Sequence, residues 1–181
     1  MGGTNNLQRL LAVLAALIVV ALALWVWRRP RTETPEQLAR MALEGDDVAR
    51  QEHAAVRLEA LVGRLPGTST RNAGRPFLAQ VFTESRHPGV RSAAVRGLAS
   101  IWDYEFLPAM LDLLDDDSAQ LRGAAAIAVE SLLSAEHRFN AADPPAQRQA
   151  VAAQLRQMWK TFAETRLPRW QQQLEQNDMK P

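Results

Sequence analysis

The hydrophobic pattern divides the chain into an apolar N-terminal run and a long amphipathic remainder. Residues 10–27 carry no charge, and Arg28, Arg29 and Arg31 follow them directly. At the helical rise, these 18 residues span about 27 Å, which is close to the ~30 Å hydrocarbon thickness of a bilayer. The pattern therefore predicts a single transmembrane helix over residues 10–27.

The same run admits a second interpretation, a cleavable secretory signal. Ala21-Leu22-Ala23 offers a small-x-small cleavage site. Cleavage there would leave a mature chain with an exposed apolar start. An uncleaved anchor explains Trp25 and Trp27 better, because indole rings favour the boundary between hydrocarbon and headgroups. We favour the anchor and keep cleavage as the alternative.

Beyond residue 33, apolar residues recur at spacings of three and four, the period of helices that bury one face. A capping box formed by Thr34 and Gln37, with Pro35 at the first helical position, starts the first helix. The pattern predicts helices over residues 35–45, 47–64, 76–84, 88–101, 105–114 and 118–133. Since no alternating run is long enough for a strand, the predicted fold class is all-α.

The longest predicted interruption covers residues 63–75, which are rich in turn formers and lack apolar periodicity. The helix before this interruption is expected to bury Val48, Ala55, Leu58, Leu61, Val62 and Leu65.

The helices come in repeating pairs. Short alanine-rich strings recur early in the second helix of each pair, Ala54-Ala55-Val56-Arg57 as Ala93-Ala94-Val95-Arg96, and Val90-Arg91-Ser92-Ala93-Ala94 as Leu121-Arg122-Gly123-Ala124-Ala125. Small residues at these positions let two helix axes approach closely. Larger side chains are expected to fill the space between pairs, namely Leu98, Ile101, Val129 and Leu132. The repetition predicts a short α-solenoid of about three helix pairs.

Residues 106–125 resemble the HEAT repeat family most clearly. The resemblance lies in a Pro in the first helix, a Leu-Leu pair, an Asp in the turn and a Leu-Arg pair before two alanines, here Pro108, Leu113-Leu114, Asp116, Leu121-Arg122 and Ala124-Ala125. Residues 76–101 match more loosely, and residues 35–65 match least, with Glu52 aligned with Arg91. The resemblance implies that Asp116 and Arg122 bridge adjacent repeats by hydrogen bonds, which is a structural role.

The C-terminal residues depart from the repeat and are expected to cap its open end. The pattern predicts a helix from residue 143 whose apolar face carries Val151, Leu155, Met158, Trp159 and Phe162. A break at Leu167-Pro168 precedes a last short helix with Trp170 and Leu174. The predicted organisation is a tail over residues 1–9, the anchor over 10–27, a basic linker over 28–33, HEAT-like repeats over 34–142 and capping helices over 143–181.

Charge and composition narrow the function classes. All 20 acidic residues lie after residue 32 with 17 of the 21 basic ones, so this part carries a net charge of −3 and is poorly suited to nucleic acid. The absence of cysteine excludes disulfides, thiolate metal sites and a cysteine nucleophile. The excess of arginine over lysine, 19 to 2, indicates a GC-rich bacterial genome.

No residues qualify as catalytic, cofactor-binding or metal-binding. Glu52-His53 and Glu136-His137 have the reverse order of the iron-binding pairs of a HEAT-type hydroxylase family, and neighbouring helical side chains point about 100° apart. The run 115–117 lacks the spaced oxygen ligands of a calcium loop and is expected to form a turn. We therefore expect no enzymatic activity and no cofactor.

Two functions from different classes remain. The favoured one is a membrane-tethered interaction or scaffold module for an unknown protein partner, with Arg57 and Arg96 in one row as a contact for acidic partners, or else as solvated surface arginines. The alternative is an accessory or lyase-like HEAT protein that binds a small ligand or metal. The arginines after the anchor favour a cytoplasmic repeat domain, with a periplasmic or external domain as the alternative.

Overall fold

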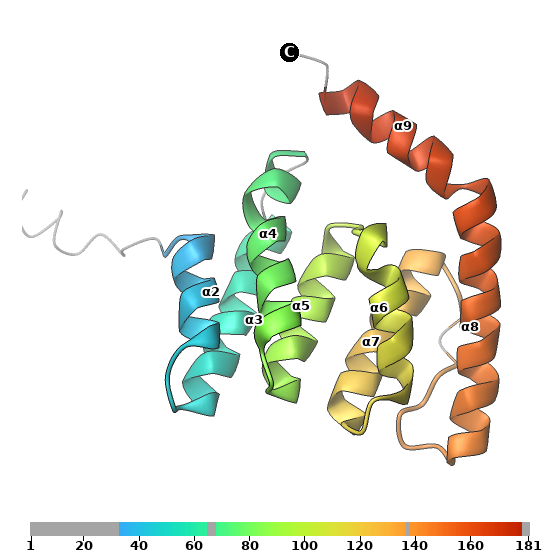
Figure 1. Ribbon diagram of the computed structural model, residues 1–181, viewed down its shortest axis with the longest axis horizontal. Coiled ribbons are helices and arrows are strands. Elements are labelled where there is room, and N and C mark those ends of the chain that lie inside the picture. Colours follow the sequence, from blue (N-terminus) through green and yellow to red (C-terminus); the bar gives the residue numbers. More distant parts are fainter. Residues whose placement is uncertain (1–32, 65–67, 137, 179–181) are drawn as a thin grey trace, which may run out of the picture. The chain divides into compact units, whose positions relative to one another are not determined.

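A computed structural model describes residues 33–64, 68–136 and 138–178, and these residues form helices and no strand (Figure 1). The described helices are α2 (Pro35–Leu43), α3 (Val48–Arg64), α4 (Thr68–Glu84), α5 (Pro88–Ser100), α6 (Leu107–Asp112), α7 (Ala119–Leu133), α8 (Pro145–Thr165) and α9 (Leu167–Asp178). Two 3₁₀ turns, η1 (Tyr104–Phe106) and η2 (Leu113–Asp115), flank α6. The predicted all-α class is confirmed for the described part of the chain.

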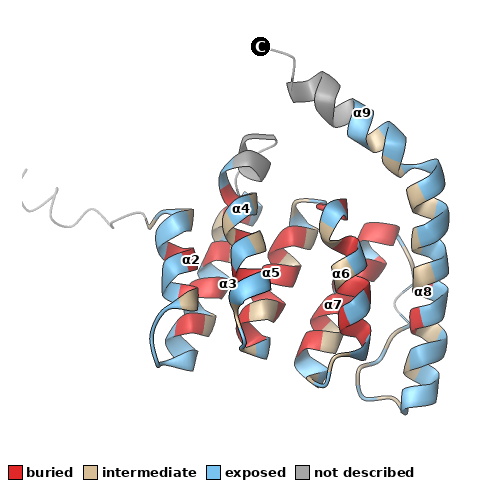
Figure 2. Ribbon diagram, in the orientation of Figure 1, coloured by how far each residue is buried: buried red, intermediate tan, exposed pale blue. Residues whose placement is uncertain are grey.

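The helices pack as three successive pairs, α2 with α3, α4 with α5 and α6 with α7. The second helices form a row in which α3 packs on α5 and α5 packs on α7. Figure 2 shows the buried residues concentrated where these helices meet. Of the side chains predicted to fill the space between pairs, Leu98, Val129 and Leu132 are buried, and Ile101 is partly buried against the core.

Several helix boundaries agree with the sequence pattern. The Thr34 hydroxyl accepts from the Gln37 amide at 3.2 Å, and the Gln37 side chain accepts from the Thr34 amide at 3.1 Å, so the predicted capping box forms.

The expectation that Val48 is buried is wrong, because this first residue of α3 is 39% exposed. The predicted helix over 105–114 is shorter and continues as 3₁₀ turns at both ends.

The predicted interruption over residues 63–75 is wrong in its second half, because α4 begins at Thr68. Pro76 lies inside this helix, and Gly74 lies against Val62 so closely that an added Cβ would meet the Val62 side chain at 2.3 Å. Packing on α3 thus stabilises a helix that local propensity disfavours. Leu65 lies outside the described residues.

An ion pair between a partly exposed arginine and a buried aspartate joins α4 to the turn after α5. Arg75 Nε donates to the fully buried Asp103 carboxylate at 2.5 Å, and Arg75 also pairs with Glu105. Burial alone would lower the pKa of Arg75, but the hydrogen bonds and negative charges of Asp103 and Glu105 outweigh burial and raise that pKa. The charged Arg75 guanidinium therefore connects α4 with the turn after α5 and with η1, which precedes α6.

The segment after α7 covers the last pair. The buried Glu130 carboxylate accepts from the backbone amides of Arg138 and Phe139, each at 2.9 Å, so residues 138–141 pass back along α7. Helix α8 then packs on α6 and α7, and Arg156 donates to Asp115 at 2.7 Å.

An aromatic cluster joins the C-terminal helices to the last pair. The Tyr104 ring stacks on Phe162 with centroids 4.8 Å apart and meets Trp170 edge-on at 4.9 Å. On the predicted apolar face of α8, Leu155 is buried, Val151, Trp159 and Phe162 are partly buried against the core, and Met158 is 40% exposed. The Leu174 side chain lies outside the described part.

No helix among the described residues is long and apolar enough to cross a bilayer. The transmembrane helix predicted over residues 10–27 lies outside those residues.

Candidate functional site

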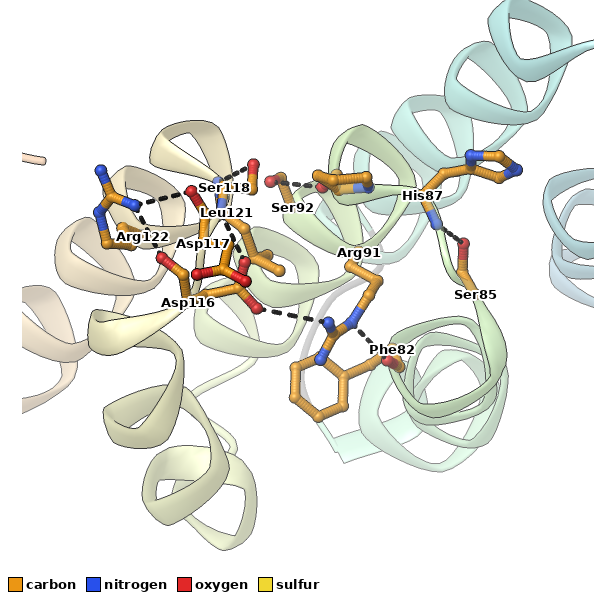
Figure 3. A network of polar contacts seen from close by, with 11 residues as sticks. Phe82, Ser85, His87, Arg91, Ser92, Asp116, Asp117, Ser118, Leu121 and Arg122 are labelled. Atoms are coloured by element: carbon orange, nitrogen blue, oxygen red, sulfur yellow. Dashed lines mark hydrogen bonds and ion pairs between the residues drawn. The ribbon is translucent and has the colours of Figure 1, made fainter.

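The turns between helices carry a chain of polar contacts along one edge of the stack, which we call the ladder edge and define by Arg91, Asp116 and Arg122 (Figure 3). Arg91 Nε donates to the Phe82 carbonyl at 3.3 Å, and its guanidinium lies 5.5 Å from the centroid of the Phe82 ring. Arg91 also reaches Asp116 of the next pair, with 3.8 Å between Nη1 and Oδ2. One arginine thereby connects two repeats.

Arg122 repeats this arrangement one pair further along. Its Nη1 donates to the carbonyls of Asp116 and Asp117 at 2.7 and 2.9 Å, and its Nη2 donates to the Ala141 carbonyl at 2.8 Å. The resemblance implied that Asp116 and Arg122 bridge adjacent repeats by hydrogen bonds. Asp116 does reach the preceding pair, through an ion pair with Arg91, whereas Arg122 donates to carbonyls of its own pair and of the segment after α7.

Glu52 takes the corresponding position in the first pair. An added Cβ at Gly89, at the start of α5, would lie 1.9 Å from Glu52 Oε1. The Glu52 carboxylate therefore lies against the N-terminal turn of the next pair's second helix, where a negative charge is favourable. Glu52 and Arg91, which align in the sequence, therefore both reach toward the next helix pair, although their charges are opposite.

The second-helix face is the candidate binding surface. The equivalent positions Arg57, Arg96 and Ile127 occur one on each of α3, α5 and α7. Arg96 Nε and Nη2 donate to the two Glu59 carboxylate oxygens on α3 at 3.0 and 2.8 Å. Arg96 is thus an oriented side chain in a two-point ion pair rather than a merely solvated arginine.

A groove of about 390 Å³ lies on this face between α5 and α7. We call it the α5–α7 groove, and its lining is Arg96, Ala99, Ser100, Trp102, Ile127, Ala128 and Ser131. The largest apolar side chains in it are also well exposed, Trp102 at 51% and Ile127 at 58%. Exposed large apolar side chains that gather in one groove are typical of a protein contact surface.

Trp102 has a left-handed backbone with φ of 57°, in the turn that ends α5. The Trp102 amide donates to Ala99 and the Asp103 amide donates to Leu98, at 3.0 and 3.1 Å, which is the Schellman motif. Glycine is the usual residue at this position, and a side chain with a Cβ costs about 1 kcal/mol there. Ser134 takes the same conformation after α7, with φ of 52°.

The repeat pattern in the sequence points to Arg57 and Arg96, but it gives no indication of the groove that Trp102 lines. The sequence does place a tryptophan directly after the predicted helix over residues 88–101, at the position that the polar Ser134 takes in the next pair. Periodicity does not reveal whether such a tryptophan is buried or exposed.

The polar residues considered for metal binding are dispersed. The described residues contain no group of three or more His, Asp or Glu side chains placed to hold a metal ion. Glu136 pairs with Arg138, and Asp115 pairs with Arg156. His137 lies outside the described residues. Asp116 accepts from the Ser118 amide at 2.9 Å and Ser118 caps α7, so residues 115–118 form the predicted turn.

Comparison with known proteins agrees with this geometry. The family profile of HEAT repeats matches residues 47–130 and again residues 75–161. No curated protein and no solved structure matches the chain. The two profile matches span the three second helices and together cover more than half of the sequence. This chain therefore belongs to the HEAT repeat family.

Proposed function

We propose that this protein is a membrane-tethered interaction module whose HEAT repeats bind a protein partner through the second-helix face. HEAT repeats commonly mediate protein–protein interaction or scaffolding. The observation that carries the proposal for this chain is the conformation and exposure of Trp102 in the α5–α7 groove. A half-exposed tryptophan at a position that favours glycine is costly for the fold alone, and a binding role accounts for it.

The proposed role is binding rather than catalysis. The ladder edge uses its charged groups to hold adjacent pairs together, and the candidate binding surface combines apolar side chains with one ion pair. This chemistry suits recognition of a protein segment. No described feature favours the alternative, an accessory or lyase-like protein with a bound ligand or metal.

The tether is proposed from the sequence of residues 10–27 and the arginines that follow. We place the repeats on the cytoplasmic side, with a periplasmic or external domain as the alternative. Protease treatment of spheroplasts tests this orientation: the cytoplasmic placement predicts that residues 32–181 stay intact until the membrane is permeabilised. Digestion of intact spheroplasts from outside would contradict it.

Affinity capture tests the interaction role. The full chain is crosslinked and purified from detergent-solubilised membranes as wild type, as Trp102→Gly and as Asp112→Ala. Asp112 is exposed on α6, outside the α5–α7 groove, and serves as the matched control. The proposal predicts a stoichiometric protein partner that Trp102→Gly loses and Asp112→Ala keeps. Copurification of a metal or pigment without any protein partner would contradict it.

A further inference from the structure

We propose that the α5–α7 groove receives an acidic amphipathic segment of the partner protein. An apolar side chain of the segment lies between Trp102 and Ile127, and a neighbouring carboxylate contacts Arg96. The inference rests on the proposed interaction role and specifies the chemistry of the partner.

The groove lining offers a site for an apolar side chain. Trp102 and Ile127 extend from the end of α5 and the middle of α7, with Ala99 and Ala128 also in the lining. Small alanines beside two large side chains leave space that an aliphatic or aromatic side chain fills. Removal of the exposed apolar area of Trp102 and Ile127 from water favours that contact.

The second helices differ in net charge from the rest of the repeats. The second helices α3, α5 and α7 hold six arginines and three glutamates, an excess of three positive charges. The rest of residues 33–144 holds five arginines against fourteen acidic residues, an excess of nine negative charges. An acidic segment is attracted to the second helices and repelled elsewhere on the repeats, which selects both its location and its orientation.

Arg96 supplies the specific contact. Glu59 occupies its Nε and Nη2 atoms, and among the described residues Nη1 has no hydrogen-bond partner. The ion pair therefore fixes the guanidinium beside the groove while it leaves donors for one more acceptor. A partner carboxylate at this atom completes a network of two carboxylates around one arginine. Since Glu59 does not line the groove, it does not obstruct the approach.

A peptide selection tests the inference. A random twelve-residue display library is selected against the full chain in detergent micelles. The expected consensus contains an aliphatic or aromatic residue next to Asp or Glu. The selected peptide is then synthesised, and its Kd is measured with the wild type and with two variant chains.

The first variant, Trp102→Gly, is expected to raise the Kd of the synthetic peptide about tenfold or more, because a tryptophan in the centre of a contact often dominates binding. The second carries both Glu59→Arg and Arg96→Glu, which keeps the ion pair but places a carboxylate at the groove. It is expected to lose the acidic peptide and to favour a lysine-substituted version of the same peptide. Thermal unfolding of each variant checks that the fold persists.

The outcomes separate the inference from the proposed function. A basic or purely apolar consensus, no selected peptide, or an acidic peptide that binds the exchanged pair as tightly as the wild type overturns the inference. If the cellular partner is still lost with Trp102→Gly in those cases, the interaction role stands and only the partner chemistry is wrong. If Trp102→Gly retains the cellular partner, the proposed role of the groove fails as well.

Discussion

The ladder edge and the α5–α7 groove lie on the same second helices but differ in how they use their side chains. On the ladder edge, Arg91 and Arg122 direct their donors at backbone carbonyls and at a carboxylate of the protein itself. In the groove, Trp102 and Ile127 expose about half of their surface, and Trp102 has a left-handed backbone. The ladder edge therefore stabilises the stack, whereas the groove has features that stability alone does not explain.

The comparison shows that arginines at repeating positions have different roles. Arg91 and Arg96 are five residues apart on α5, yet Arg91 contacts the next pair and Arg96 contacts the preceding one. Because both residues are arginines on one helix, their position within the repeat, and not the residue type, determines which neighbouring pair each of them contacts.

The largest expected effect is on the ladder edge. Arg122→Met removes donors from the carbonyls of Asp116, Asp117 and Ala141 and should lower the free energy of unfolding by about 2–3 kcal/mol. Urea denaturation followed by circular dichroism measures it. Arg86→Met, at an exposed arginine in a turn, is the matched control and should change stability by less than about 0.5 kcal/mol. If Arg122→Met and Arg86→Met lowered the free energy of unfolding equally, the structural role assigned to Arg122 would be contradicted.

Packing behind the groove gives the next effect. Gly97 follows Arg96 but faces α4, where an added Cβ would lie 2.7 Å from the Leu78 side chain. Gly97→Ala should therefore destabilise the fold by about 1–2 kcal/mol through overpacking. At Gly123 such a Cβ would lie 3.8 Å from the Ala141 side chain, an ordinary van der Waals contact, so Gly123→Ala should stabilise the fold by about 0.5–1 kcal/mol. The same sign for both changes in thermal unfolding would contradict the packing described for α5.

Arg91→Met should have a smaller effect than Arg122→Met. Its lost contacts are one hydrogen bond at 3.3 Å, an ion pair at 3.8 Å and the contact with the Phe82 ring. Together these predict a loss of about 1 kcal/mol in the free energy of unfolding. A loss as large as that of Arg122→Met would mean that the contact between pairs, rather than the backbone carbonyls, dominates the ladder edge.

The smallest effect on stability is expected at Trp102. Trp102→Gly relieves about 1 kcal/mol of backbone strain and loses the packing of a half-buried indole, so the net change should stay within about 1 kcal/mol. Ser134→Gly at the matching position after α7 should stabilise the fold by about 0.5–1 kcal/mol, because little packing is lost there. A loss above about 2 kcal/mol for Trp102→Gly would assign the tryptophan to the fold instead of to binding.

The sequence predicted most of the fold because its local signals are strong. The capping box at Thr34, the apolar spacing and the alanine-rich strings mark the helix pairs directly. The start of α4 was missed because Gly74 and Pro76 disfavour a helix locally, and contact with Val62 outweighs that preference.

The candidate site was less predictable. Arg57 and Arg96 follow from the repeat, but the pairing of Arg96 with Glu59 depends on how far α3 and α5 are rotated against each other. Likewise, the left-handed conformation of Trp102 depends on where α5 ends. Both are properties of tertiary packing, which one sequence specifies only indirectly.

Site-specific photocrosslinking tests the central claim most directly. A benzophenone amino acid is introduced at position 127 in the groove or at position 112 on α6, and cells are irradiated before purification of the full chain. The account predicts one defined protein adduct from position 127, none from position 112, and loss of the adduct when Trp102→Gly is added. An adduct from position 112 alone, or an adduct from position 127 that Trp102→Gly leaves unchanged, would contradict it.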